Sequence, residues 1–175
     1  MTSTLVLGGA RSGKSAFAQK AAEAAVSRAA GVRPTLIATG QAFDDEMAER
    51  IARHQAERGE SWVTVEAPLA LPAAIAALPA EAVAVVDCLT LWLSNLMLDE
   101  LDVELAATAL VEAVAASSAR LWLVSNEVGL GLVPETPLGR RFRDEAGRLH
   151  QRLAARVDEV YFVAAGLPLR MKPQG

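Results

Sequence analysis

Short β-branched or aliphatic runs alternate with longer alanine-rich stretches along the whole chain, and this alternation constrains the fold more than any other sequence feature. Apolar strands separated by helices are typical of a parallel sheet covered on both faces. We therefore predict a three-layer α/β fold with a mainly parallel central sheet. The expected strands span 4–8, 35–39, 62–66, 82–87, 121–125 and 159–164, and the expected helices span 14–29, 44–57, 69–78, 90–118 and 138–156.

Domain organisation follows from length and composition. The 175 residues are 52% hydrophobic and 22% charged, which excludes a disordered chain and suits a compact one. We find no internal repeat or linker, so residues 1–175 are expected to form a single domain, in which LPLRMK (167–172) adds a short edge strand. The tryptophans Trp62, Trp92 and Trp122 are expected in the core.

Charge and cysteine usage limit the partners and the compartment. A net charge of −4 gives no reason to expect a nucleic acid partner. A single cysteine, Cys88, excludes an internal disulfide and agrees with a reducing cytoplasm. The N-terminal segment lacks the basic start and apolar core of a secretory signal, and the uncharged stretch 67–80 is short and contains three prolines. We expect a cytoplasmic protein without membrane insertion.

Residues 8–15, GGARSGKS, match the phosphate-loop pattern G-x-x-x-x-G-K-[ST] between an expected strand and an expected helix. Glycines let backbone N–H groups turn inward, the helix N-terminus adds positive potential, Lys14 reaches the β and γ phosphates, and Ser15 offers a hydroxyl to Mg²⁺. The predicted nucleotide-binding residues here are Gly8, Gly9, Ala10, Arg11, Ser12, Gly13, Lys14 and Ser15.

A phosphate loop usually needs an acid at the end of a neighbouring strand to hold Mg²⁺ or its waters. Asp87 ends the apolar run AVAVVD, which places it at the carboxyl edge of the sheet, where ligands of α/β proteins bind. We predict Ser15 and Asp87 as the metal-binding residues. The alternative is that Asp87 only caps the next helix. Cys88 beside it is interpreted as a small core residue.

His54, one of two histidines, lies in DDEMAERIARHQ (44–55). With helical spacing it shares a face with Met47 and Ile51, so the pattern alone indicates a packed histidine at the end of an apolar stripe. Helical periodicity by itself gives no reason for a chemical role.

Four segments together resemble one known family: LVLGGARSGKS, IATGQAFDDEMAERIARHQ, VVDCLTLWLSNL and the long block that begins VSNEVGLGLVPE. The family is the bifunctional adenosylcobinamide kinase / adenosylcobinamide-phosphate guanylyltransferase of cobalamin biosynthesis, and the resemblance spans nearly the whole chain. It implies a P-loop NTPase-like fold, ATP and GTP as substrates, adenosylcobinamide and its phosphate as partners, and a homo-oligomer, such as a trimer.

The resemblance implies two reactions. A nucleoside triphosphate phosphorylates the aminopropanol hydroxyl of adenosylcobinamide, and GTP then gives its GMP, through a histidine, to that phosphate to form adenosylcobinamide-GDP. The matching histidine is His54, and a neutral imidazole is a suitable nucleophile near neutral pH. Arg50 and Arg58, four residues before and after it, would hold an α-phosphate. The alternative for these arginines is a solvated helix face.

Other positions match the family less firmly. The implied nucleotide contacts are Thr39, Gly40 and Gln41 after the second strand, Glu66 after the third, and Asp87. The family often has serine or another small residue where Gly40 stands. Asn126 and Glu127 are candidates for corrinoid or triphosphate contacts, with loop capping as the alternative. His150 has no counterpart in the motif and is interpreted as a solvated or packed residue.

Two other functions stay open at this stage. A single-activity P-loop kinase explains the phosphate loop and Asp87 but leaves the His54 segment unexplained. A GTP-binding switch protein would need a guanine-reading motif, and no N-K-x-D pattern occurs in the chain. Covalent labelling by GTP separates these alternatives from the bifunctional enzyme.

Overall fold

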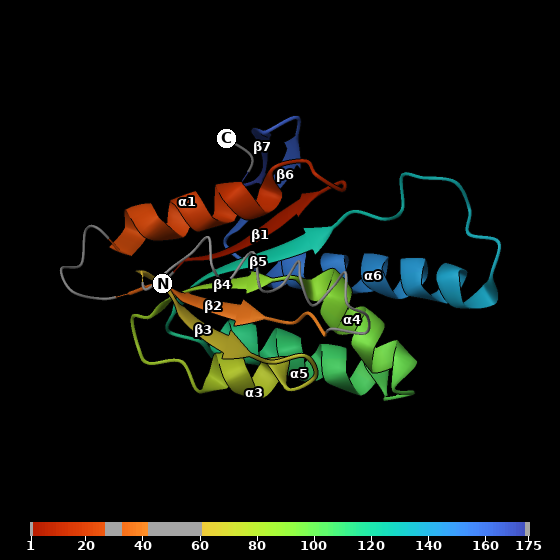
Figure 1. The fold of residues 1–175 in the computed structure, drawn as a ribbon, viewed down its shortest axis with the longest axis horizontal. Helices are drawn as coiled ribbons and strands as arrows, with labels where there is room; N and C mark the ends of the chain where they lie inside the picture. The colour runs from red at the N-terminus through yellow and green to blue at the C-terminus, as the bar shows by residue number, and fades with distance from the viewer. Residues whose placement is uncertain (1, 27–32, 42–60, 174–175) are drawn as a thin grey trace.

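The computed structural model describes residues 2–26, 33–41 and 61–173. Within them, seven strands form one sheet in the order β3-β2-β4-β5-β1-β6-β7 (Figure 1). β1 to β6 pair in parallel, and β7 pairs with β6 in the antiparallel direction. The strands are β1 (Ser3–Gly8), β2 (Thr35–Ala38), β3 (Val63–Glu66), β4 (Val83–Asp87), β5 (Arg120–Asn126), β6 (Glu159–Ala164) and β7 (Leu167–Lys172).

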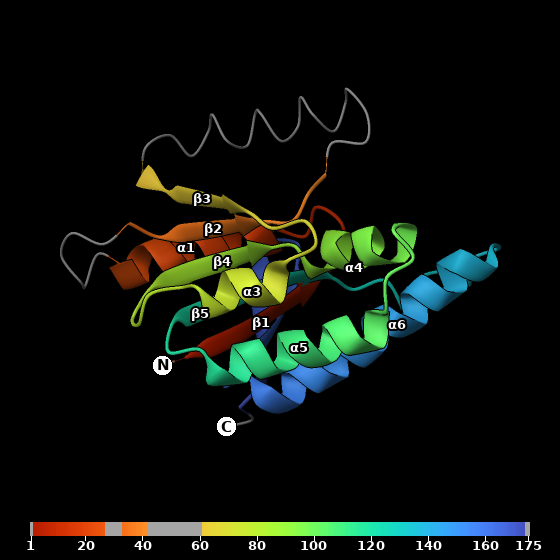
Figure 2. The same cartoon turned by 90° about the horizontal axis from the view of Figure 1, so that it is seen from below.

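Helices cover both faces of this sheet (Figures 1 and 2). α1 (Lys14–Val26) lies on one face, against β1, β4, β5 and β6. The other face carries α3 (Leu71–Ala76), α4 (Leu89–Leu98), α5 (Val103–Ala116) and α6 (Pro137–Arg156). The predicted three-layer α/β fold with a mainly parallel sheet is therefore confirmed.

The core is divided by the sheet because successive strand residues point to opposite faces. Leu5 is fully buried in the larger cluster, among residues of α3, α4, α5 and α6. Val6, the next residue, is fully buried in the smaller cluster with Ala18 and Ala22 of α1. Small alanines let α1 lie close to the sheet, which brings the helix N-terminus against the end of β1.

Several predicted boundaries differ from the structure. The stretch 90–118 was expected to contain helical material, and the structure divides it into two helices, because α4 ends at Leu98 and α5 begins at Val103. Asp102 caps α5 by accepting a hydrogen bond from Leu105 N (3.0 Å). The stretch is apolar on both sides of the break, so its hydrophobic pattern hides the change of direction, whereas the Asp cap marks it. The expected helix 44–57 lies outside the described residues.

The two edge strands, β3 and β7, differ from the expectation that each strand is covered on both faces. All four residues of β3 are exposed, and in β7 only Lys172 is partly covered. An edge strand has one neighbour and less helix above it, so its side chains face solvent. LPLRMK nevertheless forms the predicted edge strand. Trp62 and Trp92 are buried as expected, and Trp122 is half-buried.

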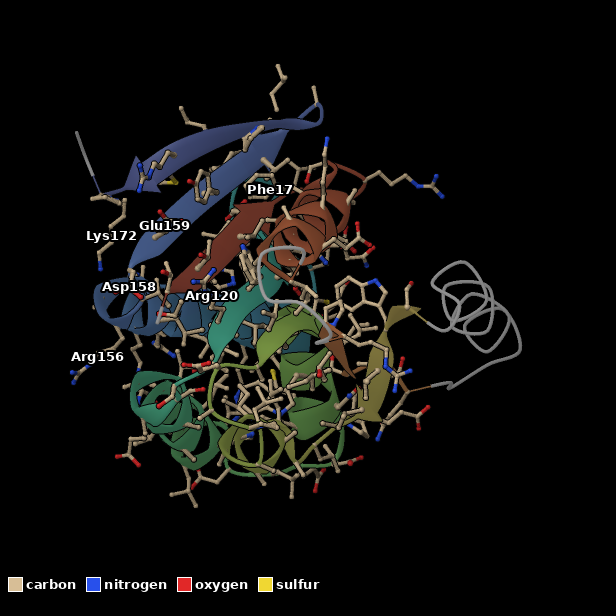
Figure 3. All side chains as sticks on the ribbon, turned by 90° about the vertical axis from the view of Figure 1, so that its left-hand side faces the viewer. Phe17, Arg120, Arg156, Asp158, Glu159 and Lys172 are labelled. Atoms are coloured by element: carbon tan, nitrogen blue, oxygen red, sulfur yellow. The ribbon has the colours of Figure 1, made fainter. Side chains whose placement is uncertain are left out.

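The amino ends of the strands are held by short polar contacts, near the labelled Asp158 and Lys172 in Figure 3. Asp158 accepts hydrogen bonds from the backbone N (2.7 Å) and hydroxyl (3.1 Å) of Ser3, and the backbone bond lowers the pKa of this carboxyl. Lys172 Nζ donates to the carbonyls of Ala154 (2.9 Å) and Val157 (2.7 Å) at the end of α6. A cation at a helix C-terminus satisfies carbonyls that have no helical partner. These contacts tie β1, α6 and β7 together.

Candidate functional site

The phosphate loop connects β1 to α1 as the sequence predicted. β1 ends at Gly8 and α1 begins at Lys14, with Phe17 N bonded to Gly13 O (2.9 Å) in the first turn. Gly13 has φ +95°, and a Cβ there would lie 3.1 Å from Gly166 Cα in the β6–β7 turn. A residue with a side chain would be strained in this conformation, so glycine is required here.

Lys14 is the central charge of this loop. Its side chain is buried, and Nζ donates to Gly9 O (2.9 Å), so the ammonium group folds back over the loop. Burial lowers the pKa of Lys14, whereas the nearby Cys88 and Asp87 act to raise it. The protein thus holds this amine out of bulk water, near the carboxylate at the end of β4.

Asp87 stands at the predicted strand end. Cys88, the next residue, is the N-cap residue of α4, and its own side chain makes no capping hydrogen bond. The N-cap position of α4 therefore lies one residue after Asp87. Its charge raises the pKa of the buried Cys88 thiol, in addition to the larger effect of burial. The Asp87 carboxylate and the Ser15 hydroxyl are oxygen donors, the kind of ligand that Mg²⁺ prefers beside phosphates.

The end of β2 lies beside the end of β4. Thr39 is fully buried; its Oγ1 accepts from Cys88 N (2.8 Å) and donates to Cys88 O (2.6 Å). Asn95 of α4 donates from Nδ2 to the carbonyls of Thr39 (2.8 Å) and Pro68 (3.0 Å). Both side chains fasten the strand ends to each other. The Thr39 hydroxyl is thus engaged with the protein backbone.

The remaining predicted contacts in this region lie at the same edge of the sheet. Glu66 and Asp87 flank Ala38 at the same level, because Ala38 pairs with Glu66 of β3 on one side and with Asp87 of β4 on the other. The Glu66 side chain is exposed, whereas Gly40 and Gln41 are half-buried. These positions therefore lie at the border of the site and not in its buried interior.

β5 ends in a polar segment next to the phosphate loop. Asn126 pairs with Gly8, and Glu127 N donates to Gly8 O (3.0 Å). The carboxylate of Glu127 accepts from Gly129 N (2.7 Å) and Leu130 N (3.0 Å), which is the loop capping expected as the alternative to a ligand contact. Glu127 therefore shapes the start of the β5–α6 loop.

Three polar residues of this edge were missed by sequence reasoning: Thr90, Asn95 and Ser125. All three are buried and hydrogen-bonded. Thr90 and Asn95 are two of the three polar residues, with Ser94, in the mostly apolar helix sequence LTLWLSNLML, and Ser125 follows the apolar run LWLV. Polar residues within a mostly apolar segment were thus the available signal, because a buried polar group needs a partner.

His54, Arg50 and Arg58 lie outside the described residues. Within the described part, no group of three or more His, Cys, Asp and Glu side chains is arranged to hold a metal ion. A metal at this edge would depend on phosphate and water oxygens in addition to Ser15 and Asp87. Among the described helices, none has the length and apolar character needed to span a bilayer.

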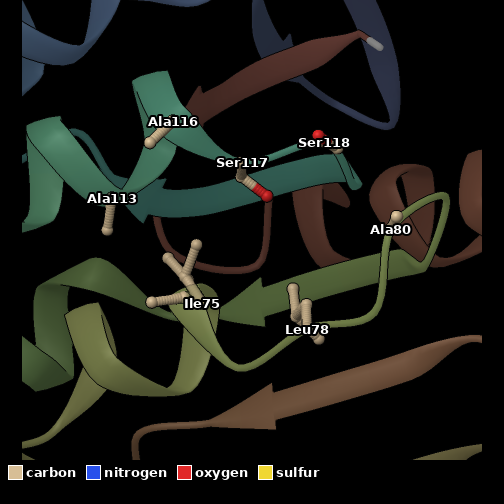
Figure 4. Close-up of a pocket in the computed structure, with 8 residues that line it drawn as sticks. Ile75, Leu78, Ala80, Ala113, Ala116, Ser117 and Ser118 are labelled. Atoms are coloured by element: carbon tan, nitrogen blue, oxygen red, sulfur yellow. The ribbon is translucent and has the colours of Figure 1, made fainter.

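A surface depression of about 320 Å³ lies between α3 and α5 (Figure 4). It lies where the chain enters β4 and β5, at the opposite end of the sheet from the phosphate loop that follows β1. Its lining is small, apolar or hydroxyl-bearing: Ile75, Ala76, Leu78, Ala80, Ala113, Ala116, Ser117 and Ser118. None of these side chains is charged, so the depression has no group to neutralise a phosphate.

The parallel sheet, the glycine-bounded loop, the buried lysine and the strand-end acid define a P-loop nucleotide-binding protein. The family model described as "Cobinamide kinase / cobinamide phosphate guanyltransferase" matches residues 4–171. The chain belongs to this family. It is an enzyme of cobalamin biosynthesis with kinase and guanylyltransferase activities, as the sequence resemblance implied.

Curated relatives agree with this assignment. The chain is 48% identical to the bifunctional adenosylcobalamin biosynthesis protein CobP of Pseudomonas aeruginosa, with 96% of each chain covered. It is 39% and 40% identical to the proteins named CobU of Escherichia coli and Salmonella typhimurium, covering 96% of this chain and 98% of each relative. Among solved structures, the P4 protein from bacteriophage phi6 in complex with ADP has a TM-score of 0.44 at 14% identity, covering 95% of this chain and 52% of that one.

Proposed function

We propose that both transfers use the one phosphate loop, and that guanylyl transfer passes through His54. In the kinase reaction, the aminopropanol hydroxyl of adenosylcobinamide attacks the γ-phosphorus of a nucleoside triphosphate. The bond to the β-phosphate oxygen breaks, the nucleoside diphosphate leaves, and the hydroxyl proton passes to solvent or a base. Such a reaction depends on positioning and on charge stabilisation.

In the guanylyl reaction, an imidazole nitrogen of His54 attacks the α-phosphorus of GTP and pyrophosphate leaves. The imidazole proton is lost, which gives a GMP-histidine. A phosphate oxygen of adenosylcobinamide phosphate then attacks the same phosphorus, the N–P bond breaks, and adenosylcobinamide-GDP forms while the histidine is restored. Arg50 and Arg58 would neutralise the α-phosphate in both steps.

The observation that carries the shared site is Lys14, whose Nζ donates to Gly9 O of the loop and lies near Asp87. In a P-loop the lysine neutralises β and γ phosphates whichever phosphorus is attacked. The Ser12 hydroxyl supports the same role, since it is buried and finds no hydrogen-bond partner among the described residues. An incoming phosphate oxygen would satisfy it.

Mg²⁺ would be held by the Ser15 hydroxyl and the Asp87 carboxylate, with phosphate oxygens completing its ligands. When bound, it neutralises charge on the transferring phosphates. Thr39, Gly40, Gln41 and Glu66 would border the nucleotide at the ends of β2 and β3. Thr39 would act by holding the ends of β2 and β4 beside the nucleotide, because its hydroxyl is bonded to Cys88, its backbone N to Asp87 O (3.4 Å) and its carbonyl to Asn95.

We further propose a cytoplasmic homo-oligomer, such as a trimer, acting on a corrinoid and nucleotides and not on nucleic acid. The net charge of −4 argues against a nucleic acid partner, the single cysteine suits a reducing cytoplasm, and the oligomer rests on the family resemblance.

The decisive experiment is covalent labelling. The protein is incubated with Mg²⁺ and GTP that carries ³²P at its α-phosphate. Wild type should acquire label that survives alkali and is lost in acid, as expected for a phosphoramidate, and should release pyrophosphate. The His54→Ala variant should take up no label yet still phosphorylate adenosylcobinamide. Equal labelling of this variant, or no labelling of wild type, would overturn the role of His54.

A further inference from the structure

A chain of polar side chains leads from α6 to the edge of the phosphate loop. His150 Nε2 lies 2.7 Å from Ser125 Oγ, which lies 3.2 Å from Thr90 Oγ1. Thr90 Oγ1 accepts a hydrogen bond from Asn126 N (2.7 Å). The chain crosses three elements, since His150 belongs to α6, Ser125 and Asn126 to β5, and Thr90 to α4.

This chain ends at the phosphate loop. Asn126 is the residue of β5 that pairs with Gly8, the first residue of the loop. The next backbone group, Glu127 N, donates to Gly8 O (3.0 Å). A shift at Asn126 is therefore passed to the residue from which the loop turns toward Lys14.

The surroundings make these hydrogen bonds costly to lose. Ser125 and Thr90 are 1% and 9% exposed, and α4 contains no ionisable residue. A buried hydroxyl that loses its partner keeps its desolvation cost. The row of hydrogen bonds therefore holds each of its side chains in one orientation. Glu127 is the charged group that acts on the ring of His150, whose pKa is lowered mainly by burial and raised in part by this carboxylate.

We propose that His150 is a positioning residue for phosphoryl transfer, which acts through Ser125 and Thr90 to fix the backbone of Asn126 beside Gly8. His150 does not contact the nucleotide. Its role goes beyond the proposed GMP-histidine route, because it concerns the loop that serves the kinase reaction as well.

The test measures the kinase reaction with MgATP and adenosylcobinamide, the binding of mant-GDP with Mg²⁺, and the melting temperature. His150→Phe keeps the ring bulk and removes the nitrogen, and Ser125→Ala removes the middle hydroxyl. Each should lower kcat about tenfold while the Kd for mant-GDP changes less than about twofold, because a shift of the loop too small to break its phosphate contacts still misaligns the reacting atoms. His150→Gln, whose amide replaces Nε2, should restore kcat to within about threefold of wild type.

A double-mutant cycle separates this role from simple packing. If the residues act as one chain, His150→Phe combined with Ser125→Ala should lower kcat no further than either change alone. Thr108→Ala is the matched control, because Thr108 Oγ1 joins α5 to α6 by accepting from Arg152 Nη2 (2.8 Å) without reaching the phosphate loop. It should leave kcat unchanged.

The proposal is overturned if His150→Phe lowers the melting temperature while kcat stays within about twofold of wild type, or if the two changes add in full. Ser125→Ala and His150→Gln keep it testable if the phenylalanine variant fails to fold. If the wild-type protein were not labelled by GTP while the His150 and Ser125 variants behaved as expected here, the result would count against the GMP-histidine and not against the role of His150.

Discussion

Gly8→Ala gives a sharp test of how the phosphate loop is packed. A Cβ on Gly8 would lie 2.4 Å from the carbonyl oxygen of Val163 and 2.6 Å from Ser12 Oγ. The Ser12 hydroxyl can rotate away, but Val163 O belongs to β6, which pairs with β1 at this level. The end of β1 must therefore separate from β6, or the loop must move.

The magnitude follows from the overlap. Forcing one extra carbon into a well-packed site costs roughly 1–3 kcal/mol, which lowers the urea midpoint by about 0.5–1.5 M if the slope is about 2 kcal/mol per molar. Equilibrium unfolding in urea measures this loss. Because the displaced segment is the phosphate loop itself, binding of mant-GDP should weaken at least about tenfold.

Gly9→Ala provides the matched control in the same loop. A Cβ on Gly9 would meet nothing within 4 Å, so this change should leave the free energy of unfolding within about 0.5 kcal/mol of wild type. If Gly8→Ala and Gly9→Ala unfolded at the same urea concentration, the steric reasoning would be wrong. Full recovery of Gly8→Ala by an added Ser12→Ala change would also refute it, because Val163 O would then not be the limiting contact.

Four further predictions concern single residues. Lys14→Ala should abolish both transfers at unchanged folding, and full GTP labelling of this variant would refute a shared site. Asp87→Asn should raise the Mg²⁺ concentration needed for half-maximal kinase activity more than it alters the melting temperature, and an unchanged requirement would exclude Asp87 as a ligand. Asn95→Leu leaves one buried and one partly buried carbonyl without this donor and should cost about 2–4 kcal/mol in urea unfolding; a loss under about 1 kcal/mol would show that they find other partners. Burial lowers the pKa of His150, so the unfolded state binds more protons than the folded state, and stability should fall as pH drops below about 6.5. His150→Gln should flatten this part of the profile of melting temperature against pH. Parallel profiles for the variant and wild type would show that His150 does not cause the pH dependence.

Local patterns were sufficient for the class of fold and for the phosphate loop. Strand and helix periods are properties of a few neighbouring residues, and GGARSGKS carries its turn, its charge and its hydroxyl within eight positions. The same reasoning placed Asp87 at a strand end, and the antiparallel edge strand LPLRMK in the sheet. It predicted helical material over 90–118 without locating the break between two helices, because a short acidic turn between two apolar segments barely changes their hydrophobic pattern.

Tertiary structure decided which distant residues meet. The order of the strands brings the end of β4 near Lys14 and sets Asn126 against Gly8, and no local pattern contains that order. His150 looked like an ordinary packed residue, yet α6 carries its ring to Ser125, 25 positions away. Hydrogen bonds between such residues depend on how helices pack across the sheet. Packing is settled by the burial of the whole core, so partners of this kind appear only when the chain has folded.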